Sequence, residues 1–309
     1  MMDWTDRHCR YFLRQVASTA FLYTEMITTG ALLRGDPERH LAFHPAEHPL
    51  AVQLGGSEPQ ELAACARLAE ERGYDEVNLN VGCPSERVQR GAFGACLMVE
   101  PLLVADCVRA MREAVAIPIT VKHRLGVDRR ADYGLVRDFV AAVSEAGCRT
   151  FITHARIAVL KGLSPRENRE VPPLDYDSVY RLKGDFPHLE IVINGGIASR
   201  PEIERHLARV DGVMLGRAAY HDPWLLADPG RRRVDVVRAM YDYAVGEVRA
   251  GTALRHISRH MLGLYHAHPR ARLWRRLLSD PARLARNDPQ LLLDAAAAVD
   301  SETALARAA

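Results

Sequence analysis

Residues 78–85 read Asn78-Leu79-Asn80-Val81-Gly82-Cys83-Pro84-Ser85, and this stretch organises the prediction of the fold. Apolar residues at alternate positions up to Val81 predict a buried strand. Gly82 then allows the backbone to turn, and Pro84 ends strand pairing. Cys83 therefore lies where a strand gives way to a loop, which in a parallel α/β barrel is the end that carries the chemistry. The thiol is a candidate catalytic group; the alternative is a buried structural cysteine.

Strands and helices alternate along most of the chain. We predict seven strands, at residues 21–26, 50–54, 74–81, 117–123, 149–154, 189–194 and 212–215. Helical patterns precede, separate or follow them at residues 5–16, 28–34, 58–72, 102–115, 133–146, 176–183 and 200–208. Such alternation is typical of a parallel sheet with helical crossovers.

A complete TIM barrel has eight strands, one more than the sequence shows. Because the chain opens directly on a helix, we expect the first strand to lie upstream of Met1, lost from a shortened N-terminus. After Pro229-Gly230 the pattern is helical only. The predicted fold is α/β: a TIM barrel at residues 1–229, with its first strand missing, followed by a small all-helical domain at residues 230–309.

The composition argues against a membrane protein or a metalloprotein. No apolar run approaches the roughly 18 residues that a membrane-spanning helix needs, and charges interrupt residues 1–10, where a secretory leader would lie. The six cysteines show neither a CxxC pair nor metal-ligand spacing. We therefore expect reduced thiols, no metal, no membrane partner and a cytoplasmic protein, and we favour a monomer.

Charge is distributed unevenly. The net charge is only +2, yet residues 230–309 carry 14 Arg against 8 Asp and Glu. A basic C-terminal segment on a mildly acidic body indicates a polyanionic partner. The alternative is a solvated helical surface in a chain that uses Arg almost exclusively, since it holds only three Lys.

Polar residues stand at the ends of successive predicted strands, where a barrel would bring them to one rim. They are Gln53, Asn80, Lys122, His123, Arg124, His154, Arg156 and Asn194. Taken singly, a strand-end Lys is usually a surface charge and a lone His a core residue. The prediction of a site therefore depends on their joint placement.

Two glycine turns follow the last two strands. Gly195-Gly196 precedes a helix that begins near Ser199, and Gly216-Arg217 precedes a second helix. In barrels the loops after the last two strands form the usual phosphate site, where backbone amides and a guanidinium bind the anion. A phosphate-bearing cofactor fits, and Lys122 and Gln53 are placed to donate to the polar edge of a flavin. Ordinary turns are the alternative.

With these residues in place, the chain resembles a known family, the tRNA-dihydrouridine synthases, and most closely their A branch. The matching segments are residues 3–10, 23–26, 78–98, 121–124, 153–156, 193–197, 212–218 and 259–264. The Asn-Val-Gly-Cys-Pro-Ser block is the most specific of them. The resemblance implies an FMN-dependent barrel with a C-terminal helical domain, which uses NADPH to reduce uridines 20/20a in the tRNA D-loop.

The resemblance also implies roles for individual residues. Cys83 corresponds to the proton donor to uracil C5, after hydride passes from the flavin to C6. The FMN positions are Gln53, Lys122, His154, Asn194, Gly195, Gly196, Gly216 and Arg217. The tRNA positions are Asn80, near the uracil, and Arg166, Arg169, Arg272 and Arg275. Cys96 lies in the same block as Cys83 and is interpreted as structural.

The N-terminus departs from the family pattern, which begins with a strand ending Ala-Pro-Met against the flavin. Met1 and Met2 are expected to keep part of that FMN contact. We expect the cofactor to be held weakly until about ten upstream residues, a strand and its lead-in, are restored. Two alternatives stay open: a small-molecule FMN oxidoreductase of the dihydropyrimidine or dihydroorotate dehydrogenase type, and a catalytically impaired tRNA-binding protein.

Overall fold

The computed structural model describes residues 2–128 and 132–306, which form two compact units. The sheet unit comprises residues 1–2, 21–43 and 48–216. The helical unit comprises residues 3–20, 44–47 and 217–309. This division differs from the predicted boundary at residue 229, because the first helix and the segment from Arg217 onward group with the C-terminal helices. Each unit is described by itself.

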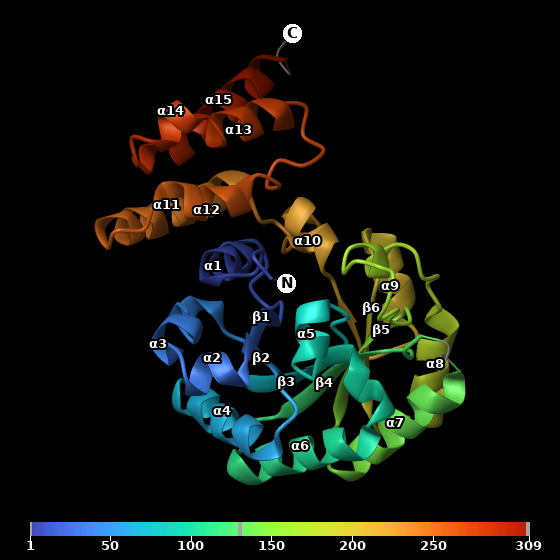
Figure 1. Ribbon diagram of the computed structural model, residues 1–309. Helices are drawn as coiled ribbons and strands as arrows, with labels where there is room; N and C mark the ends of the chain where they lie inside the picture. Colours follow the sequence, from blue (N-terminus) through green and yellow to red (C-terminus); the bar gives the residue numbers. More distant parts are fainter. Residues whose placement is uncertain (1, 129–131, 307–309) are drawn as a thin grey trace. The chain divides into compact units, whose positions relative to one another are not determined.

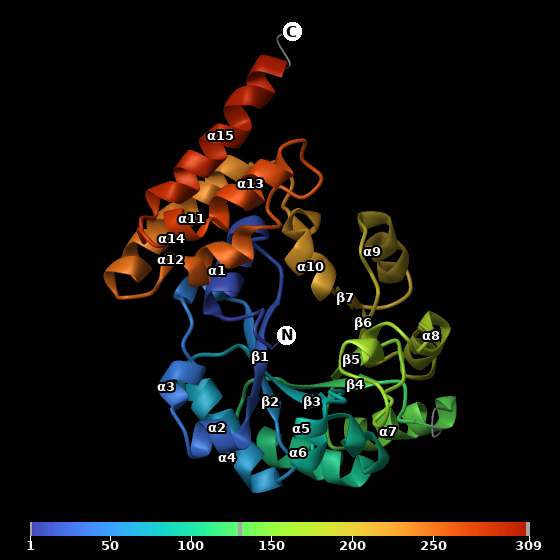
Figure 2. The same ribbon diagram turned by 45° about the horizontal axis from the view of Figure 1, so that its top comes forward.

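Seven parallel strands make the sheet of the sheet unit, and they follow one another in chain order. They are β1 (Leu22–Thr28), β2 (Leu50–Gly55), β3 (Glu76–Val81), β4 (Ile119–Arg124), β5 (Thr150–His154), β6 (Glu190–Asn194) and β7 (Gly212–Met214). Among these described strands, β1 and β7 form the two edges. Figures 1 and 2 show that the sheet curls, with helices along its outer side. The predicted α/β fold, with seven strands of a TIM barrel, is confirmed.

The helices of the sheet unit begin at clear sequence signals. They are α2 (Thr29–Leu33), α3 (Pro37–His40), α4 (Pro59–Glu71), α5 (Glu86–Arg90), α6 (Pro101–Ala114), α7 (Tyr133–Glu145), α8 (Tyr176–Asp185) and α9 (Arg200–Leu207). Proline occupies the first turn of α4, α6 and α9, where its missing N–H is not needed. Aspartate side chains cap α7 and α8. The short helices α3 and α5 were not predicted.

One face of the central strands is polar, which is unusual for a parallel sheet. In β3, Val77, Leu79 and Val81 alternate with Glu76, Asn78 and Asn80, and all six are buried. Since alternate side chains point to opposite faces, the apolar set packs under the helices and the polar set lines the inside of the curl. Polar side chains of β2 and β4 lie beside it, since Gln53 pairs in register with Asn78, and Asn80 with Lys122.

The helical unit contains no strand among its described residues, as predicted for the C-terminal segment. Its helices are α1 (Arg7–Val16), α10 (Arg217–His221), α11 (Arg233–Arg249), α12 (Leu254–Ser258), α13 (Ala271–Leu278), α14 (Pro281–Leu284) and α15 (Gln290–Ala306). Helix α1 joins them because Tyr11 stacks on Tyr243 of α11, with ring centroids 4.0 Å apart. Buried Trp274 donates from Nε1 to the Met261 carbonyl at 2.8 Å.

Nowhere in the described chain is a helix long and apolar enough to traverse a bilayer.

Candidate active site

The site is built at the carboxyl ends of β2 to β6, where the polar face of the sheet ends. Two buried amides meet first: Asn80 Nδ2 donates to Gln53 Oε1 at 2.8 Å. Gln53 Nε2 donates in turn to Asn78 Oδ1 at 2.8 Å. Because buried amides must be hydrogen-bonded to be tolerated, these contacts hold Gln53 and Asn80 in one orientation. Two predicted site residues from different strands are thus brought together.

Contacts from Asn80, Arg124 and Gly94 fix the Cys83 turn. Asn80 Oδ1 accepts the backbone N–H groups of Gly82 at 3.1 Å and of Cys83 at 3.0 Å. Arg124 Nε donates to the Gly82 carbonyl at 2.9 Å. Across the loop, Gly94 has φ +76°, and a Cβ there would lie 2.6 Å from the Cys83 carbonyl oxygen. This close packing requires glycine, and it fixes the position of the thiol.

Cys83 is one of two half-buried thiols among the six cysteines. Its side chain is half-buried, with Sγ 3.6 Å from Ser85 Oγ. Cys65, Cys107 and Cys148 are buried, and burial raises the pKa of each to about 12. Cys96 is half-buried, but its Sγ lies 3.1 Å from the Phe93 carbonyl oxygen inside the loop. The geometry favours the catalytic interpretation of Cys83 over the structural one.

Lys122 places a cation inside the polar face, in register with Asn80. Its Nζ forms no hydrogen bond or ion pair with the residues that the structure describes. Burial lowers the pKa of Lys122 to about 8; Arg124 adds to this effect and Cys83 opposes it. The Lys122 side chain is half-buried, and an ammonium that is partly removed from water without a partner is costly, so this group is suited to bind an acceptor atom of a ligand.

His154 supplies a second unsatisfied group. Its Nδ1 is buried and has no hydrogen-bond partner within the described chain. Burial lowers the pKa of His154 well below its usual value, and Arg124, Lys122, Arg156 and Arg169 lower it further. The imidazole is therefore neutral at physiological pH, and a polar atom of a ligand can satisfy its free nitrogen.

His123, Arg124 and Arg156 were also expected at the rim, and the structure corrects this for His123. His123 faces the opposite side, where it bonds the Arg124 carbonyl oxygen at 2.8 Å and Thr153 Oγ1 at 3.1 Å among aromatic rings. Arg124 donates to the carbonyls of Ile157 and Asn168 besides Gly82. Arg156 donates to the carbonyls of Arg169 and Pro172. Backbone carbonyls thus occupy these guanidiniums, which brace the loops around the site.

The first glycine turn follows β6 at the same end of the sheet. Gly195 and Gly196 have φ values of +121° and +72°, which side chains rarely adopt. Tyr176 Oη donates to the Gly195 carbonyl at 2.7 Å, and Asn194 Nδ2 to the Met214 carbonyl at 2.8 Å. Helix α9 begins shortly after, capped by Ser199. The turn is thus fixed, with Gly196 exposed, and can admit a close ligand.

The remaining predicted residues are placed as follows. Gly216 ends the sheet unit, whereas Arg217 opens the helical unit. Met2 belongs to the sheet unit and is 54% exposed, and Met1 lies outside the described residues. Arg166 and Arg169 are exposed in the loop after β5, with Arg166 Nε 3.7 Å from Glu170 Oε2. Arg272 and Arg275 are exposed on α13, whose other face buries Trp274 and Leu278.

Sequence reasoning missed Asn78 and Thr120, which lie in register with Gln53 and two residues before Asn80 and Lys122 on their strands. Asn78 Nδ2 donates to Thr120 Oγ1 at 2.8 Å. Both precede a predicted site residue by two positions, Asn80 and Lys122 respectively. A period of two places them on the same face as those residues, so this spacing is the signal that could have found them.

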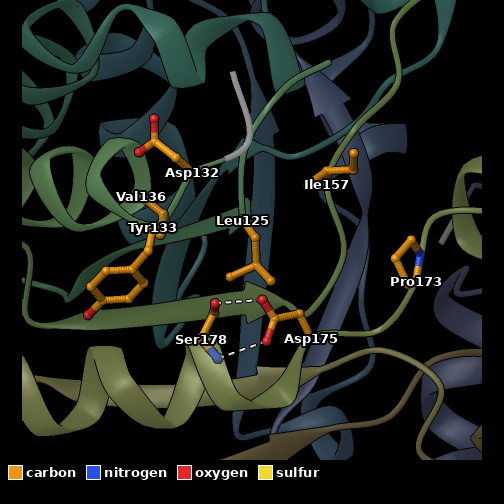
Figure 3. Close-up of a pocket in the computed structure, with 8 residues that line it drawn as sticks. All are labelled: Leu125, Asp132, Tyr133, Val136, Ile157, Pro173, Asp175 and Ser178. Atoms are coloured by element: carbon orange, nitrogen blue, oxygen red, sulfur yellow. Dashed lines mark hydrogen bonds between the residues drawn. The ribbon is translucent and has the colours of Figure 1, made fainter. Parts of the chain in front are cut away.

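A separate pocket of about 140 Å³ lies between the start of α7 and the start of α8 (Figure 3). Its two acidic side chains are already hydrogen-bonded within the fold. Asp132 Oδ1 accepts the Leu135 N–H, and Asp175 accepts the backbone N–H and the hydroxyl of Ser178. The predicted site residues are not among those that line it. Throughout residues 2–128 and 132–306, no cluster of acids, His and Cys is suited to bind a metal.

Comparison with known proteins identifies the family of the chain. The family model described as dihydrouridine synthase (Dus) matches residues 1–301. The chain belongs to the dihydrouridine synthase family. A tRNA-dihydrouridine(20/20a) synthase of Pseudomonas syringae pv. tomato is 57% identical over 307 residues, covering 96% of this chain and 91% of that protein. The Escherichia coli K12 protein of that name is 57% identical over 94% of this chain and 88% of its own length.

A third dihydrouridine synthase, the tRNA-dihydrouridine(20/20a) synthase of Vibrio parahaemolyticus, is 54% identical and covers 98% of this chain and 96% of that protein. Among solved structures, a complex of 2-naphthoyl-CoA reductase with 2-naphthoyl-CoA has a TM-score of 0.51. It is 12% identical and covers 72% of this chain and 46% of the reductase chain, so it supports the fold alone. The resemblance to the dihydrouridine synthases, and with it the enzyme class, is confirmed.

Proposed function

We propose that the protein is a tRNA-dihydrouridine(20/20a) synthase, which reduces the C5–C6 double bond of D-loop uridines with FMN as cofactor and NADPH as reductant. The observation that carries the proposal is the Cys83 turn. A half-buried thiol is held beside the polar face of the sheet, in a chain that belongs to the dihydrouridine synthase family. A tRNA substrate also agrees with a cytoplasmic location.

The residues present fit FMN. His154 Nδ1 is a buried polar atom and Lys122 Nζ belongs to a half-buried side chain, and neither has a partner in the described chain; a flavin ring edge and its side chain offer acceptors and hydroxyls to both. Gly195 and Gly196 adopt positive φ values, and Gly196 is exposed, so its backbone is accessible to a ligand. The residues proposed to hold FMN are Met1, Met2, Gln53, Lys122, His154, Asn194, Gly195, Gly196, Gly216 and Arg217. Bound FMN, once reduced by NADPH, supplies the hydride that uracil C6 accepts.

Cys83 completes the reduction by giving its Sγ proton to uracil C5. Asn80 Oδ1 accepts the backbone N–H groups of Gly82 and Cys83, and these hydrogen bonds hold the thiol in place at the end of the strand. General acid catalysis requires such positioning within hydrogen-bond reach of the acceptor. The second amide hydrogen of Asn80 Nδ2 is available to a uracil carbonyl, which agrees with its predicted place near the base.

The target uridine must leave its stack to reach this site. We propose that the helical unit binds the tRNA through phosphate contacts. Arg272 and Arg275 stand on the exposed face of α13, and Arg166 and Arg169 stand on the loop after β5. Since each phosphate contact releases counterions, tRNA binding should weaken as salt rises.

Removing two of these arginines tests the tRNA interface. In the double variant Arg272→Ala, Arg275→Ala we expect tRNA affinity to fall about tenfold and the slope of log K against log salt to shrink by about 2. Filter binding from 50 to 300 mM salt measures both. The matched control is Arg109→Ala, Arg137→Ala, which removes two exposed arginines paired with Asp106 and Asp138 on α6 and α7. Equal slopes in the two double variants would contradict the proposed interface.

The proposed activity is tested with the purified protein. Its absorption spectrum reports bound flavin, and NADPH oxidation is compared with bulk tRNA and with free uracil. We expect oxidation to accelerate only with tRNA from a strain that lacks dihydrouridine, and dihydrouridine to appear at positions 20 and 20a. Oxidation driven by free uracil would instead support the small-molecule oxidoreductase.

A further inference from the structure

Buried polar groups continue beneath the candidate site, from Asn80 down to the first residue of β3. Asn80 bonds Gln53, Gln53 bonds Asn78, and Asn78 bonds Thr120, each at 2.8 Å. Thr120 Oγ1 then donates to Glu76 Oε1 at 2.6 Å. All five side chains are at most 9% exposed. The series therefore links the Cys83 turn to a buried carboxyl at the far end of the strands.

Every hydrogen bond in this series has the same direction. The Cys83 backbone N–H can only donate, so the atom of Asn80 that faces it must be the oxygen. Asn80 then presents its nitrogen to Gln53, and Gln53 presents its own nitrogen to Asn78. The same reasoning makes Thr120 an acceptor from Asn78 and a donor to the next group. The last member must be an acceptor, and an ionised carboxylate is one that cannot donate.

We propose that Glu76 and Thr120 are positioning residues of this enzyme: as the terminal acceptor and its relay, they complete the series that begins at the Cys83 N–H and hold the amides of Gln53 and Asn80 in the orientation that it sets. The inference rests on the proposed function, because it concerns the side chains assigned to FMN and uracil. With the series intact, each amide nitrogen keeps one N–H that the series does not use. If the series reversed, the nitrogen and oxygen of each amide would exchange places, and donors to the cofactor and the base would be lost.

The surroundings of Glu76 agree with an acceptor role. Burial raises the pKa of Glu76 to about 7, against hydrogen bonds from Thr120 and Tyr23 that favour the carboxylate. Glu190 of β6 also raises it, and Thr150 of β5 donates to Glu190 at 2.7 Å. At pH 8 the carboxyl is therefore mostly ionised, and its oxygens accept from both hydroxyls. The comparisons that follow are made at that pH.

The decisive variants are Thr120→Val and Thr120→Ser. Valine keeps the shape of threonine but removes the hydroxyl, whereas serine keeps the hydroxyl. We expect Thr120→Val to raise the Kd for FMN about tenfold, because one buried hydrogen bond is lost and its neighbours are left unsatisfied. We expect Thr120→Ser to stay within about twofold of wild type. Flavin fluorescence titration measures the Kd, and near-UV circular dichroism checks that each variant is folded.

A second measurement does not depend on the cofactor. In flavin-free protein, alkylation of Cys83 by iodoacetamide, followed by peptide mass spectrometry, reports how firmly the Asn80-bonded turn is held. We expect Thr120→Val to change this rate about fivefold and Thr120→Ser to preserve it. Cys96, alkylated in the same sample, is the internal reference because it is half-buried and lies outside the series.

The possible results distinguish a positioning role from a packing role and from failure of the proposed function. Loss in the valine variant with rescue by serine, in FMN affinity and in Cys83 alkylation, supports the positioning role. Wild-type values in the valine variant overturn it, and so do equal losses in the valine and serine variants, which would indicate packing alone. A wild-type protein that binds no FMN contradicts the proposed function instead, and the alkylation comparison still decides the role of Glu76 and Thr120.

Discussion

Replacing Cys83 by Ala should lower turnover on tRNA by about three orders of magnitude, within the range expected for loss of a general acid. The variant should retain its FMN and should still oxidise NADPH. The thiol is half-buried, and its fixed contacts are made by the backbone of the turn. Alanine therefore removes the proton donor without disturbing the turn. Single-turnover assays that follow flavin reduction and dihydrouridine formation separately measure the two half-reactions.

The control for this prediction is Cys96→Ala. Cys96 is the other half-buried thiol of the same segment, but its Sγ contacts the Phe93 carbonyl inside the loop. We expect near wild-type turnover from this variant. If Cys83→Ala also lost flavin reduction by NADPH, or if Cys96→Ala lost turnover equally, Cys83 would not be the specific proton donor.

Replacing Lys122 by Met should raise the Kd for FMN by about two orders of magnitude, because a hydrogen bond from a buried charge contributes about 1.5–3 kcal/mol. Affinity in wild type should also fall as pH rises through about 8, where burial places the pKa of Lys122 in the flavin-free protein. Lys122→Arg keeps its charge over this range and should abolish that decline. Fluorescence titrations from pH 6.5 to 9.5 test both statements.

The same substitution should stabilise the flavin-free protein. The Lys122 ammonium is charged in both folded and unfolded states below pH 8, and its burial then opposes folding. Between a folded pKa of about 8 and a usual value of 10.5, the unfolded state binds more protons, so wild-type stability rises with pH. We therefore expect Lys122→Met to be more stable than wild type by about 3 kcal/mol at pH 7, and this difference in unfolding free energy should shrink toward pH 10.5. A difference that did not change with pH in urea titrations would contradict the lowered pKa of Lys122.

Much of the fold could be predicted because it depends on local patterns. Alternating apolar residues place all seven strands within a few residues of where they lie. Glycine and proline mark the Cys83 turn because the constraints on their backbones apply in any context. The parallel order then brings Gln53, Asn80 and Lys122 to one end of one sheet.

The sequence could not distinguish ligand-binding from structural residues among strand-end side chains of similar chemistry. His123 and His154 both end strands, yet one packs among aromatic rings and the other keeps a buried nitrogen free for a ligand. The guanidiniums of Arg124 and Arg156 likewise donate hydrogen bonds to loop carbonyls and not to a ligand site. A position at the end of a strand predicts that a residue lies near the rim. It does not predict the residue's hydrogen-bond partners, because loops from distant parts of the sequence supply them.

The sequence by itself determined the strand order, the turn with its thiol and the family to which they belong, because periodicity and turn chemistry act over a few residues. Only the tertiary structure decided that α1 joins the C-terminal helices and that the polar face forms one directed series from Cys83 to Glu76. The physical reason is that a hydrogen bond's direction depends on both partners. Here those partners come from three different strands, joined only by folding.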